Sequence, residues 1–329
     1  MTDFLAAVRA QPEMLERSAR SMLAALASMG GAPAGLRTGR LLAFGMGSSG
    51  HAAAGFAGWL RTLGRPASAL TASLVDGPDL ADGYLAISQS GRSRETVEAL
   101  SVLSGPNRVA MTSYPGAPLG TATDAVLPLD CTVDSRVSTA SYTAILQALG
   151  LLADALAGRP CTDWAALPRL VAQALDADAG PVADALACVR AVDVIATGHR
   201  VASAGAAALL VREALRLPAA AYPTDDYRHG ALEVAGPGHG VLVFGAGRHM
   251  ALAAELAGYG ATVILVTDEP GKLPRATNLV PLRLPALPGL AGCVLDIVPV
   301  QLAVAELAAR RGTPIGLLHM PADTKLSDS

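Results

Sequence analysis

Aromatic and charged side chains are scarce in this sequence. Phe, Trp and Tyr make up only 4% of the 329 residues and charged residues only 16%, whereas hydrophobic residues reach 51%. This composition excludes disorder as the main state and predicts a large core built from small aliphatic side chains. The formal net charge is -3 and no basic run stands out, so we expect no nucleic acid partner.

We also expect no paired cysteines, no leader segment and no membrane-spanning run. None of the four cysteines forms a C-x-x-C pair, so we expect reduced thiols and no zinc site. The N-terminal stretch MTDFLAAVRAQPEMLERS carries charges throughout, so no signal peptide is expected. The most apolar helical segment, 142–157, is interrupted by Gln147 and Asp154 and is interpreted as too short and too polar to span a membrane.

Short apolar segments alternate with helical ones along the chain. Strands are expected near 41–44, 68–74, 84–88, 108–112 and 125–129, and again near 193–197, 240–244, 262–267 and 278–282. Helices are expected at 3–28, 94–103, 137–157 and 294–310, with another ending at Leu215. The alternation predicts an α/β fold of two tandem doubly wound parallel-sheet domains. We expect an N-terminal helix in 1–35, one domain in 36–160, a helical connector in 161–190 and a second domain with a C-terminal tail in 191–329.

A glycine-rich turn follows the first expected strand. The segment GMGSSG at 45–50 fits the pattern G-x-G-x-x-G between a strand and a helix, which is typical of dinucleotide sites. Ser48 and Ser49, however, place hydroxyl groups where a dinucleotide fold brings bare backbone. Asp76 is not clearly at a strand end, where a ribose-binding acid would lie. A dinucleotide site and a simple tight turn therefore stay open as alternatives.

A serine-rich segment follows the third expected strand. AISQSGRS at 86–93 places three hydroxyls and an amide between a strand end and a helix start. Unpaired backbone N–H groups and the positive end of the helix dipole meet there, and both favour a phosphate. Several charge-assisted hydrogen bonds of about 1.5–3 kcal/mol each would compensate for dehydrating it. The alternative is that Ser93 is only the helix N-cap and the other serines are turn residues.

These motifs resemble those of the sugar isomerase (SIS) family. GMGSSGHA is similar to a ligand loop of its glucosamine-6-phosphate synthase branch, and ISQSGRSRET to the serine-rich phosphate loop. The segment RVSTAS at 136–141 resembles a closing loop, although Ala140 replaces a lysine, and Gln11-Pro12 resembles a short E-Q-P element. The resemblance implies tandem flavodoxin-like SIS domains and a phosphorylated sugar as substrate. The implied ligand-binding residues are Gly47, Ser48, Ser49, Ser88, Gln89, Ser90, Ser93 and Ser138.

The second half of the chain carries the residues that the resemblance implies to be catalytic. VREAL resembles the helix with the family's glutamate, which maps to Glu213. YRHG resembles its K-H-G motif and maps the histidine to His229, although Ala231 replaces the usual proline. TKLS resembles the tail whose lysine reaches the sugar carbonyl, which maps to Lys325. The alternatives are an exposed ion pair for Glu213, a surface histidine and a frayed tail.

These implied roles describe proton transfer between C1 and C2 of an open-chain sugar phosphate. Glu213 would shuttle the proton, His229 would open the ring, and Lys325 would polarise C2 or form a Schiff base. This chemistry needs no metal and no other cofactor. In this family the histidine is donated to the neighbouring subunit, so the resemblance implies a cytoplasmic homodimer with shared active sites.

Two sequence features narrow the choice of substrate. Nothing resembling a glutaminase precedes the first isomerase-like unit, so we expect no ammonia supply from glutamine. S-Q-S-G-R-S with Arg92 is most similar to the deaminase branch, and we predict a glucosamine-6-phosphate deaminase-like enzyme acting on an amino-sugar 6-phosphate. The alternatives are an aldose–ketose isomerase, a fructosamine-6-phosphate deglycase and an effector-binding module without catalysis. Glu213 and Lys325 favour an enzyme over the module.

Overall fold

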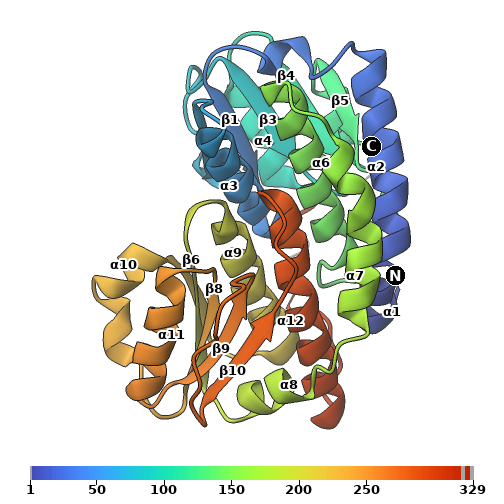
Figure 1. The fold of residues 1–329 in the computed structure, drawn as a ribbon. Helices are drawn as coiled ribbons and strands as arrows, with labels where there is room; N and C mark the ends of the chain where they lie inside the picture. The colour runs from blue at the N-terminus through green and yellow to red at the C-terminus, as the bar shows by residue number, and fades with distance from the viewer. Residues whose placement is uncertain (1, 320–322, 327–329) are drawn as a thin grey trace.

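Two α/β lobes with separate sheets make up the chain (Figure 1), and the computed structural model describes residues 2–319 and 323–326. The first sheet contains β1 (Leu41–Gly45), β2 (Ala67–Thr71), β3 (Gly83–Ile87), β4 (Arg108–Thr112) and β5 (Ala125–Pro128). The second contains β6 (Ala191–Ala196), β7 (Ala219–Pro223), β8 (His239–Phe244), β9 (Thr262–Thr267) and β10 (Leu279–Arg283). The predicted fold class is confirmed.

Both sheets are parallel and have the same strand order. The orders are β2-β1-β3-β4-β5 and, read in the same sense, β7-β6-β8-β9-β10. This is the flavodoxin-like order 2-1-3-4-5, and it differs from the order 3-2-1-4 of the dinucleotide fold. In such sheets ligands bind at the carboxyl ends of the strands where the order reverses. The candidate edges are therefore those of β1 with β3 and of β6 with β8.

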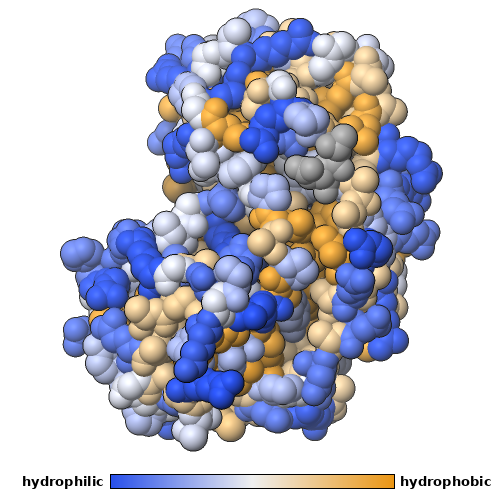
Figure 2. All heavy atoms as spheres, viewed as in Figure 1, coloured by the Kyte–Doolittle hydropathy of each residue, from blue (hydrophilic) through white to orange (hydrophobic). Residues whose placement is uncertain are grey.

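Helices cover the sheets and join the lobes. The first half contains α1 (Phe4–Arg9), α2 (Gln11–Ser28), α3 (Gly47–Thr62), α4 (Arg94–Val102), α5 (Pro118–Thr121) and α6 (Ala140–Ala157). The connecting region and second half contain α7 (Leu167–Leu175), α8 (Gly180–Ala187), α9 (Val201–Leu210), α10 (Thr224–Arg228), α11 (Arg248–Gly258) and α12 (Leu290–Arg310). Figure 2 shows polar residues along α2 and over α10, and apolar residues where the lobes meet.

Several expected elements differ from the observed ones. The single helix expected at 3–28 is two helices that meet at Ala10, because Pro12 has no N–H to donate into a preceding turn. β7 was not predicted, because its residues AAAYP lack the branched side chains typical of strands. The helices α10 and α11 were not predicted either. The last long helix begins at Leu290 rather than at 294.

Two helices, α6 and α12, are long and apolar enough to cross a membrane by length and composition. The interpretation of 142–157 as too short and too polar was therefore wrong, because α6 has 18 residues that meet both requirements. Burial distinguishes these helices instead: 89% of the α6 window and 83% of the α12 window lie inside the protein. Both are core helices, and α12 packs against α6, α7 and α9.

The lobes meet where α3 packs antiparallel to α9. Small residues allow the two backbones to approach closely. A Cβ atom on Gly55 of α3 would lie 2.5 Å from Cβ of Ala202, and one on Gly205 of α9 would lie 2.3 Å from the ring of His51. Further along, Gly47 faces Leu209. The start of α3 in the first lobe therefore lies beside the end of α9 in the second lobe.

The close contact predicts that Gly55→Ala destabilises the protein. Alanine is the better helix former, but its Cβ would also meet the His199 carbonyl oxygen at 2.8 Å, so overpacking should cost about 1–3 kcal/mol. Gly258→Ala is the matched control, because no atom lies within 4 Å of a Cβ at this exposed helix end. Thermal unfolding should show a lower midpoint only for Gly55→Ala. An unchanged or raised midpoint would contradict the close contact.

Candidate functional site

The starts of two helices face the switch point of the first sheet. β1 leads into α3 and β3 leads into α4, so both helices begin at the carboxyl edge of the sheet. Within the described chain, neither Met46 before α3 nor Ser93 before α4 caps its helix with a side-chain hydrogen bond. The partial positive charges of both helix starts therefore point into the space above the sheet. Ser93 is not acting as an ordinary helix cap.

A cleft of ≈ 340 Å³ lies at this edge. Its walls come from both lobes, since Leu209 and Glu213 of the second lobe face the two loops of the first. All the ligand-binding residues that the resemblance implies line this cleft, together with two of the three catalytic ones. They are Gly47, Ser48, Ser49, Ser88, Gln89, Ser90, Ser93, Ser138, Glu213 and Lys325.

Two glycines allow the loops to take their shape. A Cβ atom on Gly45 would lie 2.7 Å from the Ile87 carbonyl oxygen of the neighbouring strand. Gly91 in the serine loop has a φ of +64°, and a Cβ there would lie 2.7 Å from Cβ of Ala117. The loop is thus a tight turn as well as a row of hydroxyls, and the tight packing explains both glycines.

The side-chain amide of Gln89 anchors the serine loop. Gln89 donates from Nε2 to the Cys131 carbonyl oxygen at 3.1 Å. The Ser90 hydroxyl accepts from the Arg92 N–H at 3.3 Å, and the Ser93 hydroxyl lies 3.4 Å from a Glu95 oxygen. These contacts are long and use only part of each hydroxyl's capacity, so the serines can still donate to a ligand.

The C-terminal segment 323–326 lies antiparallel to the serine loop. Ser93 and Lys325 form a β-bridge, the Arg94 N–H donates to Thr324 at 3.1 Å, and the Leu326 N–H donates to Arg92 at 2.9 Å. These bonds place Lys325 at the mouth of the cleft, which argues against a frayed tail. Ser327 of the same motif lies outside the described residues.

Glu213 projects from an irregular end of the helix that begins as α9. Residues Val211–Leu215 form a π-helical turn, a geometry frequent at functional sites, and Arg216 ends it with a φ of 55°. Arg212 and Arg216 donate to backbone carbonyls, and no ion pair of Glu213 is found within the described chain. Burial raises the pKa of Glu213 to about 7, against a smaller lowering by Arg212. The carboxyl can therefore accept and release protons near neutral pH.

His229 lies apart from this cleft. It is exposed at the end of α10 and lines no part of the cleft as described in a single chain. The structure thus brings together the serine loops, Glu213 and Lys325, but not the third predicted catalytic residue.

Asp134 is a cleft residue that the sequence analysis missed. Its carboxylate accepts from the Thr139 N–H at 2.9 Å, from the Thr139 hydroxyl at 2.6 Å and from the Ser141 hydroxyl. Ser138 in turn lies 2.8 Å from the Ser141 hydroxyl. The signal was an acidic residue just before a run of hydroxyl residues, which needs an acceptor to fix its turn. Among the described residues, no group of three or more His, Cys, Asp or Glu side chains could hold a metal ion.

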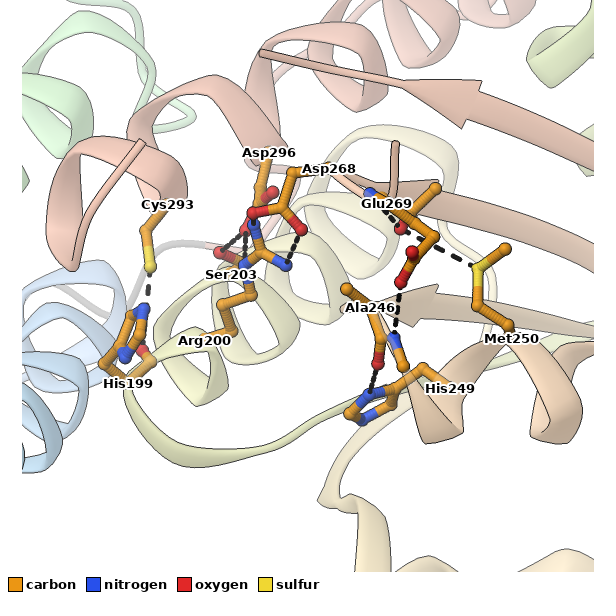
Figure 3. Close-up of polar contacts among 12 residues, drawn as sticks. His199, Arg200, Ser203, Ala246, His249, Met250, Asp268, Glu269, Cys293 and Asp296 are labelled. Carbon is orange, nitrogen blue, oxygen red and sulfur yellow. Dashed lines mark hydrogen bonds and ion pairs between the residues drawn. The ribbon is translucent and has the colours of Figure 1, made fainter. Parts of the chain in front are cut away.

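The corresponding edge of the second sheet is filled by the chain's own charges (Figure 3). Arg200, after β6, forms ion pairs with Asp268 at 2.9 Å and with Asp296 of α12 at 3.4 Å. The Gly247 N–H at the start of α11 donates to the Glu269 carboxylate at 3.0 Å. Carboxylates thus take the place that an anionic ligand would occupy, so the first sheet holds the candidate ligand site.

Solved structures of other proteins have the same architecture, although sequence comparisons find no relative. No protein-family model and no curated protein sequence matches the chain. The C-terminal domain of glucosamine-fructose-6-phosphate aminotransferase from Francisella tularensis superposes with a TM-score of 0.82 at 20% identity, over 95% of this chain and 97% of that one. Glucosamine-6-phosphate deaminase from Thermotoga maritima gives 0.79 at 22%, over 97% and 98%.

A third solved structure, tagatose-6-phosphate ketose/aldose isomerase from Escherichia coli, gives a TM-score of 0.79 at 19% identity, over 98% of this chain and 97% of that one. These values define the class of fold: the chain has the two-lobed fold of these proteins along nearly its whole length. The fold implied by the resemblance to the SIS family is therefore confirmed.

The arrangement of the serine loop predicts weaker phosphate binding in Ser90→Ala. Losing one charge-assisted hydrogen bond of about 1.5–3 kcal/mol should raise the Kd of a sugar phosphate about tenfold to a hundredfold. Ser101→Ala is the control, because Ser101 is exposed on α4 and donates to the Glu98 carbonyl oxygen outside the cleft. Isothermal titration calorimetry with a panel of sugar phosphates measures the Kd of both variants. Equal affinities in Ser90→Ala and the parent would refute the assignment.

Proposed function

We propose that the protein is a phosphosugar enzyme that transfers a proton between C1 and C2 of an open-chain sugar phosphate. One observation carries the proposal: a half-buried carboxyl with a pKa raised to about 7 and a row of serine hydroxyls at two helix starts line the same cleft. The first group suits general acid–base catalysis and the second suits a phosphate. The shared fold with phosphosugar enzymes supports this combination.

In this mechanism the two lobes divide the work. Ser88, Ser90 and Ser93 hold the phosphate at the start of α4, which fixes the sugar chain across the cleft. Glu213 of the second lobe takes the proton from one carbon and returns it to the next on the same face of an enediol. A carboxyl whose pKa lies near the working pH serves both steps. Lys325 at the cleft mouth acts on the sugar carbonyl.

Within this class we propose an amino-sugar 6-phosphate as substrate, with glucosamine 6-phosphate as the leading candidate. Isomerisation would give an imine at C2, and water would release it as ammonia and a ketose phosphate. The motif S-Q-S-G-R-S and the likeness to a glucosamine-6-phosphate deaminase fold favour this choice. An aldose–ketose isomerase is the second candidate, favoured by the likeness to a tagatose-6-phosphate isomerase fold. A fructosamine-6-phosphate deglycase would use the same proton transfer.

We further propose a cytoplasmic homodimer in which His229 completes the site of the partner subunit. His229 is exposed and outside its own cleft, so it is free to enter another. Val234 and Tyr259 on the same lobe expose 58% and 49% of their surface, which is apolar area that an interface would cover.

Glu213→Gln should abolish turnover and leave sugar-phosphate binding nearly intact. The amide has the same shape but cannot take the proton, so the rate should fall at least about 10²–10⁴-fold. Entry of solvent deuterium into the recovered sugar measures the proton transfer, and ammonia release measures deamination. Full activity of Glu213→Gln would show that another group is the base.

The same two signals separate the candidate substrates. Deuterium uptake with ammonia supports the deaminase, whereas deuterium uptake without ammonia from amino sugars, together with turnover of neutral sugars, supports the isomerase. Tight binding with neither signal, for any amino or neutral hexose 6-phosphate, would make the protein an effector-binding module and refute the enzymatic proposal.

If two subunits share each active site, mixing two inactive variants should restore activity. In a mixed dimer of Glu213→Gln and His229→Asn, one site carries both substitutions and the other carries neither. Random reassortment of equal amounts should therefore recover about a quarter of the parental activity with a cyclic substrate. A mixture no more active than its separate components, or a fully active monomer, would contradict sharing of the site.

A further inference from the structure

A second, much smaller cavity adjoins the cleft behind Glu213. It shares Ser48, Ser138 and Glu213 with the cleft and is otherwise lined by Tyr142 of α6, Gln301 of α12 and apolar side chains. Its volume of ≈ 10 Å³ is about the space that one water-sized group needs. We call this cavity the niche. It is one oxygen atom wide and lies beside the proposed base.

Tyr142 brings an unpaired hydroxyl to the niche. The residue is only 1% exposed, and its hydroxyl has no hydrogen-bond partner among the described residues. A buried unpaired hydroxyl costs about 1–3 kcal/mol, which a phenylalanine in the same space would avoid. Packing of the ring alone therefore does not explain a tyrosine here. Burial raises the pKa of Tyr142 well above its usual value, so the hydroxyl stays protonated and can donate.

Gln301 brings a second donor. Its Oε1 accepts a hydrogen bond of 2.9 Å from Nε2 of Gln11, and Gln11 itself is held by donating to the Val8 carbonyl oxygen at 2.8 Å. This contact orients the amide of Gln301 and leaves its N–H groups as the end available to the niche. Gln11 belongs to the Gln11-Pro12 element noted in the sequence. Another buried group without a partner among the described residues, the side-chain amide of Gln147, does not line the niche.

We propose that Tyr142 and Gln301 are positioning residues for Glu213, to which both donate through one water-sized oxygen seated in the niche. The inference rests on the proposed function of Glu213 and adds to it what holds that carboxylate in place. Two donors from two different helices converge on one acceptor, which fixes the rotamer of Glu213 toward the cleft. They also favour its ionised form, so they counteract the effect of burial.

Of the other ionisable groups near Glu213 or the niche, Arg212 on the same turn lowers the pKa of Glu213. His51 of α3 lies near Arg212 and Asp296 of α12 lies near Tyr142. Glu95, Asp134, Arg136 and Lys325 line the cleft. Replacing the Tyr142 hydroxyl by hydrogen changes none of these charges. A shift in the titration of Glu213 after that replacement therefore reports on the niche.

Tyr142→Phe tests the proposal. Removing a donor from the carboxylate disfavours its charged form, so the acidic limb of the kcat/KM profile should move up by about one pH unit. At pH 7 kcat/KM should fall about fivefold because the ionised fraction of Glu213 drops, while KM stays nearly unchanged because the serine loop is untouched. The thermal unfolding midpoint should change little, because the substitution leaves no described protein group without its hydrogen-bond partner.

Tyr84→Phe is the matched control. Tyr84 is also buried, but its hydroxyl accepts from the Ala81 N–H at 3.2 Å and donates to the Pro78 carbonyl oxygen at 3.3 Å, away from the cleft. This variant should lose stability and keep the parental pH profile. Gln301→Met supplies a second variant that removes the other donor and should move the limb in the same direction as Tyr142→Phe.

Three results would overturn the proposal: an unmoved limb in both niche variants, an equal loss of kcat at every pH, or a loss of stability without a shift. The proposal can also be tested without measuring enzymatic turnover. Carbon-13 NMR titration of labelled Glu213 should show a higher pKa in Tyr142→Phe even if no substrate reacts, and an unchanged pKa would refute it. Absence of deuterium exchange in the parent would instead refute the proposed function alone.

Discussion

The close contact between α3 and α9 is the interaction on which the site depends. Gly55 and Gly205 allow the helices to approach so closely that an added methyl group at either position would clash. Because the helices are antiparallel, this contact brings the start of α3, with Ser48, to the end of α9, with Glu213. The serine-rich loops and the Glu213 carboxyl come from different lobes, and this helix pair brings them together.

The two halves share a strand order but differ in the charged groups at their switch points. At the first switch point, the helix starts after Met46 and Ser93 have no side-chain cap, and serine hydroxyls line the cleft beside them. At the second, Arg200 meets Asp268 and Asp296, and Glu269 accepts from the start of α11. A ligand at the second edge would have to displace these internal carboxylates. Among the described residues, the candidate ligand cleft therefore lies at the first sheet, and the second half contributes Glu213 to its lining.

Much of the fold and of the cleft could be predicted from the sequence because the signals are local. Apolar strands such as Leu41–Gly45 and the serine loop combine pattern and chemistry within a few residues. β7 was missed because alanines carry no strand signal. Tyr142 and Gln301 were missed because they meet only through the packing of distant helices. Asp134 was missed although its contacts with Thr139 and Ser141 are local. The role of His229 stays a prediction, since it needs a second subunit.

The central claim is that one cleft holds the phosphate at the serine loop and the sugar carbons at Glu213. A crystal structure with an open-chain hexitol 6-phosphate tests it most directly. The account predicts the phosphate within hydrogen-bonding distance of Ser88, Ser90 and Ser93, with C1 and C2 beside the Glu213 carboxylate. A phosphate bound outside this cleft, or a nicotinamide dinucleotide lying across Gly45–Gly50 in a competing soak, would contradict it.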